Sequence, residues 1–159
     1  MIRAAMPADL PAMTAVLNEI IATGGTTAHQ TEFTETGFRA HYLDGQDAVC
    51  CHLAEADGRV VGFQVLGFYP ALPEGWLDIG TFVSASFRGT GAGAALFAGT
   101  KAVAQDRGCG VINATIRADN LPGIGFYTRL GFKDYASDAE FALKDGRRVG
   151  RISKRYDLV

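Results

Sequence analysis

Three glycines and an arginine separate an apolar run from a helix-forming run in the segment FVSASFRGTGAGAALFAGTKAVAQDRG, residues 82–108. Gly89, Gly91 and Gly93 remove Cβ atoms from a short stretch of backbone where a helix is expected to begin. Successive N–H groups at such a helix start can approach an anion closely, and the helix dipole adds a partial positive charge. The spacing therefore predicts a loop that binds a phosphate-bearing ligand.

Two common kinds of phosphate-binding loop fit this segment poorly. A Walker A loop requires Gly-Lys-Ser/Thr, whereas the chain has Gly-Thr-Lys at residues 99–101 and no other match. The dinucleotide pattern G-x-G-x-x-A is met by Gly89, Gly91 and Ala94, but it expects an acidic residue about 20 positions further on. Asp119 lies too far along the chain for that role, which disfavours a dinucleotide.

The apolar periodicity and the turn residues predict the elements that position this loop. Their order is strand, two helices, three strands, helix, strand, helix and two strands, which indicates a mixed sheet flanked by helices. Tight hairpin turns are expected at Asp57–Gly58 and Asp145–Gly146. The predicted strands lie at residues 2–6, on both sides of the first turn within 48–70, and at 75–85, 110–116, 133–144 and 147–158. The predicted helices begin at Pro7, within 37–45, at Gly91, and at Asp119 or Asn120, the last one ending at Gly131.

The composition is that of an ordinary globular protein, and we expect one domain over residues 1–159. A net charge of −2 gives no global field for nucleic acid, and no apolar run reaches the roughly 18 residues needed to span a bilayer. Cys50, Cys51 and Cys109 form no CxxC motif and the histidines lack metal-ligand spacing, so no metal is expected. A reduced, cytoplasmic compartment fits this cysteine usage.

A third loop pattern, Arg/Gln-x-x-Gly-x-Gly/Ala, is met by Arg88, Gly91 and Gly93. At this point the chain resembles the GNAT superfamily of acyl-CoA-dependent N-acyltransferases. The later segment INATIRADNLPGIGFYTRLGF is similar to the second cofactor motif of that superfamily, with Asn120 and Tyr127 at matching positions. Two spaced motifs in the right order make the resemblance specific, and it covers nearly the whole chain.

The resemblance implies both a fold and a cosubstrate. The fold is α+β, with a central mixed, mostly antiparallel twisted sheet of about seven strands, about four flanking helices and the order βααβββαβαββ. The implied cosubstrate is acetyl-CoA. The residues that the resemblance assigns to its binding are Phe82, Val83, Arg88, Gly89, Thr90, Gly91, Ala92, Gly93, Ala94, Asn120 and Tyr127.

Transfer of an acetyl group from a thioester to an amine requires a neutral amine, a stabilised oxyanion and a proton for the departing thiolate. Asp78, on the strand before the loop, is the candidate base, with a solvent-facing strand carboxylate as its equal alternative. The sequence also leaves Glu19, Glu32 and a water molecule open as bases. The resemblance assigns proton donation to Tyr127 and oxyanion stabilisation to the Val83 backbone N–H, along a strand that pantetheine approaches like an added strand.

The segment LNEIIATGGTTAHQTEFTE resembles the phosphinothricin acetyltransferase-like group, whose members acetylate small amino acids and their analogues. This resemblance implies a small-molecule primary amine as acceptor, contacted by His29 and Glu32, with direct attack in a ternary complex, and it leaves a homodimer open. The group usually has Glu in place of Asp78 and His in place of Tyr127, which puts the acceptor in question. Basic residues near the C-terminus could pair with an acceptor carboxylate or a second subunit, or guard a sheet edge. They are Arg147, Arg148, Arg151, Lys154 and Arg155.

Two other functions stay open on the sequence alone. One is a non-catalytic domain that binds or senses acyl-CoA, and the other is an acetyltransferase for protein N-termini or lysines. Asp78 and Tyr127 together favour an enzyme over a sensor. The acceptor groove, which separates small molecules from peptides, depends on tertiary structure.

Overall fold

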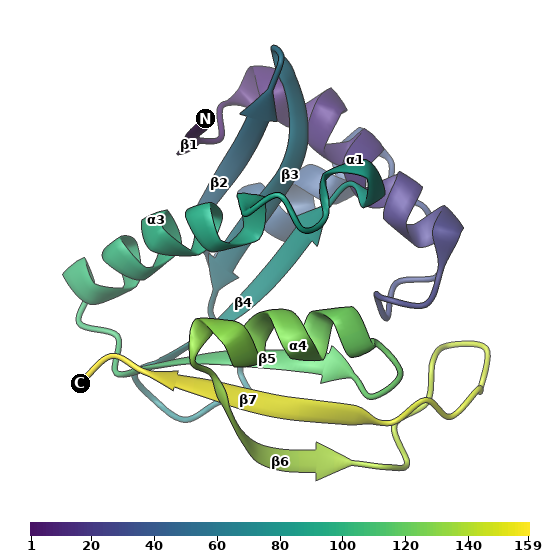
Figure 1. The fold of residues 1–159 in the computed structure, drawn as a ribbon, viewed down its shortest axis with the longest axis vertical. Coiled ribbons are helices and arrows are strands. Elements are labelled where there is room, and N and C mark those ends of the chain that lie inside the picture. The colour runs from purple at the N-terminus through teal and green to yellow at the C-terminus, as the bar shows by residue number, and fades with distance from the viewer.

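All seven strands belong to one sheet in the computed structural model, which describes residues 1–159 (Figure 1). The strand order is β1-β2-β3-β4-β5-β7-β6, and every neighbouring pair is antiparallel except β4 and β5. The strands are β1 (Ile2–Ala4), β2 (Ala48–Ala56), β3 (Arg59–Gly67), β4 (Trp76–Val83), β5 (Val111–Arg117), β6 (Lys133–Asp138) and β7 (Arg151–Asp157). The helices are α1 (Leu10–Thr23), α2 (Glu35–Phe38), α3 (Ala92–Asp106) and α4 (Leu121–Leu130). The predicted α+β class and element order are confirmed.

The first hairpin forms where the sequence predicts it. Asp57 and Gly58 join β2 to β3 with φ values of +52° and +74°, as a two-residue turn between right-twisted strands requires. Alternation along these strands then sends Phe63 and Val65 to the face that packs against α1 and Phe38. This apolar face fixes the register of the first half of the sheet.

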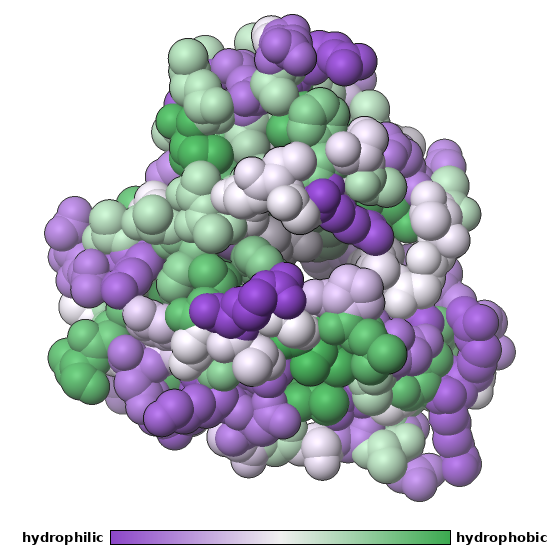
Figure 2. Space-filling view, viewed as in Figure 1, coloured by the Kyte–Doolittle hydropathy of each residue, from purple (hydrophilic) through white to green (hydrophobic).

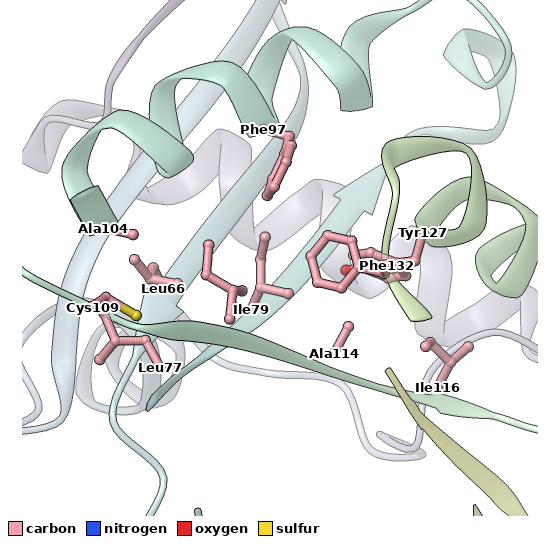
Figure 3. Close-up of a cluster of buried hydrophobic side chains, with 11 residues drawn as sticks. Leu66, Leu77, Ile79, Phe97, Ala104, Cys109, Ala114, Ile116, Tyr127 and Phe132 are labelled. Atoms are coloured by element: carbon pink, nitrogen blue, oxygen red, sulfur yellow. The ribbon is translucent and has the colours of Figure 1, made fainter. Parts of the chain in front are cut away.

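The opposite face of the sheet is covered by α3 and α4, which lie in front of it in Figure 1. Figure 3 shows the cluster beneath them, where Phe97 of α3, Tyr127 of α4 and Ile79 of β4 meet. Tyr127 and Phe132 lie edge to face, with ring centroids 5.1 Å apart. The functional candidate Tyr127 is therefore held by core packing on this face.

β4 and β5 pair over only three residues and then diverge, as Figure 1 shows. The last pair joins Asp78 to Asn113, so the second half of β4 has a bonded neighbour only in β3. Beyond Asp78 the sheet has an internal gap, and its edges consist of backbone groups that a ligand can reach. This gap is the feature of the fold that positions the site.

The two final strands are shorter than the sequence predicts, because the chain between Asp138 and Gly150 folds back on itself as a loop. The Asp138 carboxylate accepts a hydrogen bond from the Glu140 backbone N–H, which turns the chain out of the sheet after β6. Gly150, with φ of +68°, turns it again before β7. The expected hairpin is reduced to an isolated bridge between Ala142 and Arg148 inside this loop.

No helix is both long and apolar enough to cross a membrane. No three histidine, cysteine or acidic side chains lie close enough together to hold a metal ion.

Candidate functional site

A cavity of about 1030 Å³ occupies the gap between β4 and β5. Its walls come from the glycine loop (residues 88–91) and the start of α3, from α4, and from residues 26–29 in the segment that follows α1. The space-filling view shows a hollow in this face between α3 and α4, with strongly hydrophilic side chains at its rim (Figure 2). The cavity therefore joins the predicted phosphate loop to the segment predicted to line the acceptor site.

The glycine loop offers a row of backbone donors to this cavity. The N–H groups from Gly89 to Ala94 have no acceptor within the chain, and the first helical bond of α3 runs from the Ala95 N–H to the Gly91 carbonyl. Gly89 and Gly91 have φ values of +78° and +88°, and a Cβ atom at either position would point into open space. Six consecutive free donors at the start of a 15-residue helix fit a pyrophosphate.

Thr90 and Gly93 have local roles that the sequence analysis did not anticipate. The Thr90 hydroxyl donates to the Phe87 carbonyl at 2.6 Å, and its side chain is not part of the cavity wall. A Cβ atom on Gly93 would lie 2.5 Å from the Phe126 ring, so this glycine allows α3 to approach α4. The expected phosphate contact at both positions is left to their backbone N–H groups.

Arg88 and Arg129 are two of the four arginines on the cavity wall. Arg88 precedes the loop, as expected, while Arg129 reaches the wall from the last turn of α4. Sequence reasoning missed Arg129, because a basic residue near a helix C-terminus is ordinary and its neighbours depend on helix packing. Both guanidinium groups add positive charge to the cavity wall.

The edge of β4 that faces the gap carries the backbone donor predicted at Val83. The Ser84 N–H donates to the Val61 carbonyl, so Ser84 points its donor toward β3. Successive N–H groups along a strand point to opposite sides, which turns those of Val83 and Thr81 toward the gap. Phe82 and Val83, the predicted cofactor contacts on this strand, both line the cavity.

Asp78 lies at the point where the two strands part. Its Oδ1 accepts a hydrogen bond of 2.7 Å from the Asn113 amide, which is itself buried and accepts from the Tyr135 hydroxyl. Burial raises the pKa of Asp78 to about 6, and the Asn113 hydrogen bond opposes that rise. The alternative of an ordinary solvent-facing carboxylate does not match this half-buried, hydrogen-bonded position on the cavity wall.

Tyr127 reaches the same cavity from α4. Its side chain is buried, and its hydroxyl lies 2.8 Å from the Thr81 hydroxyl. Burial raises the pKa of Tyr127 above its usual value, the Thr81 hydrogen bond lowers it, and the nearby Asp78 charge raises it further. A carboxylate and a protonated phenol thus share one cavity, and the charge of the carboxylate raises the pKa of the phenol.

The other candidate carboxylates take different positions. Glu19 accepts hydrogen bonds from the Ser84 hydroxyl at 3.2 and 3.3 Å, and it lies outside the cavity wall. Glu32 is exposed and is likewise absent from the wall, so the structure does not bring this predicted acceptor contact to the site. The two carboxylates on the wall are Asp78 and Asp47.

The predicted acceptor segment after α1 lines the cavity, and His29, its predicted contact residue, lies on the wall. The His29 ring nitrogen Nε2 lies 2.7 Å from the Tyr42 hydroxyl, and His41 packs against both rings. Burial lowers the pKa of His29, so its imidazole is biased toward the neutral form. Tyr42 also lines the cavity, and sequence reasoning missed it because the pairing with His29 is tertiary.

Hydrogen bonds to two backbone carbonyls fasten this acceptor segment to the rest of the site. Asn120 accepts from the Gly123 N–H as the N-cap of α4 and donates to the Thr26 carbonyl at 3.2 Å. Arg117, buried and paired with Asp119, donates to the Thr27 carbonyl at 2.9 Å. Asn120 therefore caps α4 and holds the acceptor segment in addition to lining the cavity.

Among the basic residues that gather near the C-terminus, Arg151 lines the cavity. Its guanidinium stacks on the Phe141 ring at 4.7 Å and lies 3.8 Å from the Asp138 carboxylate. Arg155 instead lies over Trp76, and Lys154 is buried against Asp134. The expected link between this basic group and an acceptor carboxylate is thus reduced to one side chain.

Residues 14–132 match the Acetyltransferase (GNAT) family, over a stretch that includes the glycine loop, the diverging strands and α4. The chain belongs to the GNAT acetyltransferase family. Membership confirms the superfamily predicted from the loop and from the α4 motif. It also confirms an acyltransferase that uses acetyl-CoA, for which the unpaired donors of the loop provide a fitting site.

Known relatives of this GNAT protein differ in their acceptors. A stretch of 104 residues is 36% identical to a mycothiol acetyltransferase of Saccharomonospora viridis, and it covers 60% of this chain and 34% of that protein. The chain thus spans about a third of the length of that relative. A ribosomal-protein-alanine N-acetyltransferase from Brucella melitensis is 25% identical over 99% of both chains, with a TM-score of 0.86.

A GNAT superfamily phosphinothricin acetyltransferase from Sinorhizobium meliloti, crystallised with acetyl-CoA, is also similar. Its TM-score is 0.87 over 99% of this chain and 88% of that one. At 20% identity this likeness concerns the fold alone.

A charge placed in the glycine loop should prevent acetyl-CoA binding. We expect Gly91→Glu to bind acetyl-CoA at least about tenfold more weakly than Gly91→Gln, because the carboxylate repels the pyrophosphate at the helix start. Both side chains are strained at a φ of +88°, so the pair isolates the charge. Isothermal titration calorimetry measures the affinities, and equal binding of both variants and the parent would remove the loop from the cofactor site.

The raised pKa of Asp78 makes its charge a cost to stability. The folded protein keeps Asp78 protonated up to about pH 6, whereas the unfolded chain releases this proton near pH 4. The stability that the bound proton contributes is therefore largely present at pH 4 and is lost as the pH rises through 6. Between pH 4 and pH 7 we expect the free energy of unfolding of Asp78→Asn to rise, relative to that of the parent, by at most about 3 kcal/mol. Urea unfolding at both pH values measures this difference, with Asp47→Asn as control. If Asp78→Asn changes the free energy of unfolding by the same amount at both pH values, the Asp78 charge is not buried in the folded protein.

Proposed function

We propose that this GNAT enzyme acetylates the α-amino group of a small, carboxylate-bearing amino acid or analogue by direct attack in a ternary complex. One observation supports this most: Asp78, Tyr127, Arg151 and the donor edge of β4 all line the same cavity. Each provides a function that the reaction requires, and the glycine loop opens into the same space.

The cosubstrate site follows from the free backbone donors. Acetyl-CoA, when bound, supplies the acetyl thioester. The loop N–H groups from Gly89 to Ala94 hold its pyrophosphate, with Arg88 and Arg129 beside them. The gap-facing N–H of Val83 donates to the thioester oxygen as negative charge develops there, and this donor is already oriented by the pairing of β4 with β3.

Asp78 acts as the base, directly or through a water molecule. With its pKa raised to about 6 it is ionised at pH 7, yet it accepts a proton more readily than an exposed aspartate. An α-amine has a reference pKa of about 8, so roughly a tenth of it is neutral at pH 7 and a modest base suffices.

Tyr127 holds a proton at its hydroxyl oxygen for the departing sulfur. The Asp78 charge raises the pKa of Tyr127, so proton uptake by Asp78 makes the phenol a stronger acid. The two groups are thereby coupled in the order that the reaction needs, with deprotonation of the amine first and protonation of the thiolate second. Asp78 reaches the cavity from β4 and Tyr127 from α4, and the cavity of about 1030 Å³ has room for both substrates.

Arg151 is the residue that we assign to the acceptor carboxylate. Its ion pair with Asp138 is long, at 3.8 Å, so its N–H groups remain available for hydrogen bonds. Stacking on Phe141 orients the guanidinium. His29 and Tyr42 form the facing part of the acceptor wall. A peptide N-terminus is the second candidate acceptor, favoured by the similarity to the Brucella ribosomal-protein-alanine N-acetyltransferase.

Removal of the Tyr127 hydroxyl should slow turnover without loss of cofactor affinity. We expect Tyr127→Phe to lower kcat by about 10² to 10⁴-fold while the KM for acetyl-CoA changes little, because the ring stays and the proton is lost. Thiol release from acetyl-CoA with a good acceptor measures both constants. The control is Tyr156→Phe, whose hydroxyl accepts a hydrogen bond from Lys101 away from the cavity. An unchanged kcat excludes Tyr127 from proton transfer.

The carboxylate of the acceptor should be recognised. An amino acid should be acetylated about 10 to 100-fold faster than its amide at equal concentration, as expected for a charge-assisted hydrogen bond. Arg151→Gln should reduce this preference, whereas Arg148→Gln, at an exposed residue paired with Glu140, should not. Mass spectrometry of the mixed products, with an alanine-initiated peptide as third competitor, measures the ratios. Equal or faster acetylation of the amide or the peptide shows that no α-carboxylate is recognised.

A further inference from the structure

A row of polar side chains crosses the apolar interface between α3 and the sheet and ends at Tyr127. His52, Gln64 and Thr81 are register partners on β2, β3 and β4, so they lie side by side on one face. Gln64 is fully buried, and its amide donates to the Thr81 hydroxyl at 2.9 Å. The Thr81 hydroxyl in turn lies 2.8 Å from that of Tyr127.

Packing alone does not explain polar groups at this interface. The His52 Nδ1, Gln64 Oε1 and Thr100 Oγ1 atoms are buried without a hydrogen-bond partner in the chain. Such atoms cost free energy, and a sheet face under a helix is normally apolar, like the neighbouring Leu66 and Ile79. A buried glutamine at this position, despite this cost in free energy, points to a task for its amide.

The direction of donation along the row identifies that task. A hydroxyl group has one hydrogen and two lone pairs, and Gln64 occupies one lone pair of Thr81. If Thr81 gives its hydrogen to the Tyr127 oxygen, every donor in the row points the same way and the bonds strengthen one another. The hydrogen of Tyr127 is then released from Thr81 and is free to point into the cavity.

We propose that Thr81 and Gln64 are positioning residues that direct the Tyr127 proton toward the departing sulfur and stabilise the phenolate that remains. This inference rests on the proposed role of Tyr127 as proton donor. When the O–H bond of Tyr127 breaks, its electron pair stays on the phenol oxygen and the proton forms an S–H bond. The Thr81 hydroxyl donates to that oxygen, Gln64 supports Thr81 from behind, and solvent returns a proton to the phenolate after the thiol leaves.

The test compares Thr81→Val, which keeps the side-chain shape, with Thr81→Ser, which keeps the hydroxyl. We expect Thr81→Val to lower kcat about 10 to 100-fold with little change in the KM for acetyl-CoA, as for the loss of a hydrogen bond to a charged group. Thr81→Ser should restore kcat to within about threefold of the parent. Thr81→Ala replaces the valine variant if thermal melting shows that the latter does not fold.

Combination with Tyr127→Phe separates positioning from a general structural role. We expect Thr81→Val to have no further effect on kcat in the Tyr127→Phe background, because residues that act as one unit are not additive. Gln64→Met should lower kcat less than Thr81→Val, and not at all once Thr81 is valine. An equal loss with and without the tyrosine hydroxyl overturns the proposal.

Two outcomes distinguish this inference from the proposed function on which it rests. If Tyr127→Phe is slow while Thr81→Val turns over like the parent, Tyr127 is the proton donor and the positioning role is wrong. If Tyr127→Phe itself turns over like the parent, the proton-donor role fails first, and the positioning role fails with it.

Discussion

The separation of β4 from β5 after the Asp78–Asn113 pair is the constraint on which the rest of the site depends. A continuous sheet would satisfy the Thr81 and Val83 backbone groups with a neighbouring strand and leave no donor edge. The divergence instead opens a cavity in the middle of the sheet, while one hydrophobic cluster packs on each face of the sheet around it. Rigid packing on both sides keeps the donors oriented before any ligand arrives.

The gap also allows side chains from opposite faces of the sheet to line the same cavity. Asp78 alternates with Ile79 along β4 and belongs to the α1 face, while Thr81 and Tyr127 belong to the α3 and α4 face. In an intact sheet the backbone would lie between a base on one face and an acid on the other. Because the strands part, both side chains reach one cavity, and the raised pKa of Asp78 reflects its half-buried position there.

The sequence predicts the order of elements because local signals determine it. The Asp57–Gly58 turn, the Asn120 cap and the alternation in β3 depend on neighbouring residues, and each is found where it is expected. The prediction of a long final hairpin is wrong because the Asp138 carboxylate accepts from the Glu140 N–H and ends β6 early. The residue pattern does not show whether this aspartate side chain bonds to the backbone or faces solvent. Within the site, Tyr42 and Arg129 have no local signal, since only tertiary packing brings them to the cavity. The environment of Asp78 likewise depends on Asn113, which is 35 positions away along the chain.

The attachment of the acceptor segment through the carbonyls of Thr26 and Thr27 has a consequence for the evolution of specificity. Every residue has a backbone carbonyl, so mutations at these two positions leave the anchors from Asn120 and Arg117 in place. Side chains along this wall, including His29, can therefore change without loss of its attachment to the end of β5 and the start of α4. A family with this arrangement can acquire new acceptors by ordinary point mutation while the acetyl-transfer residues stay the same.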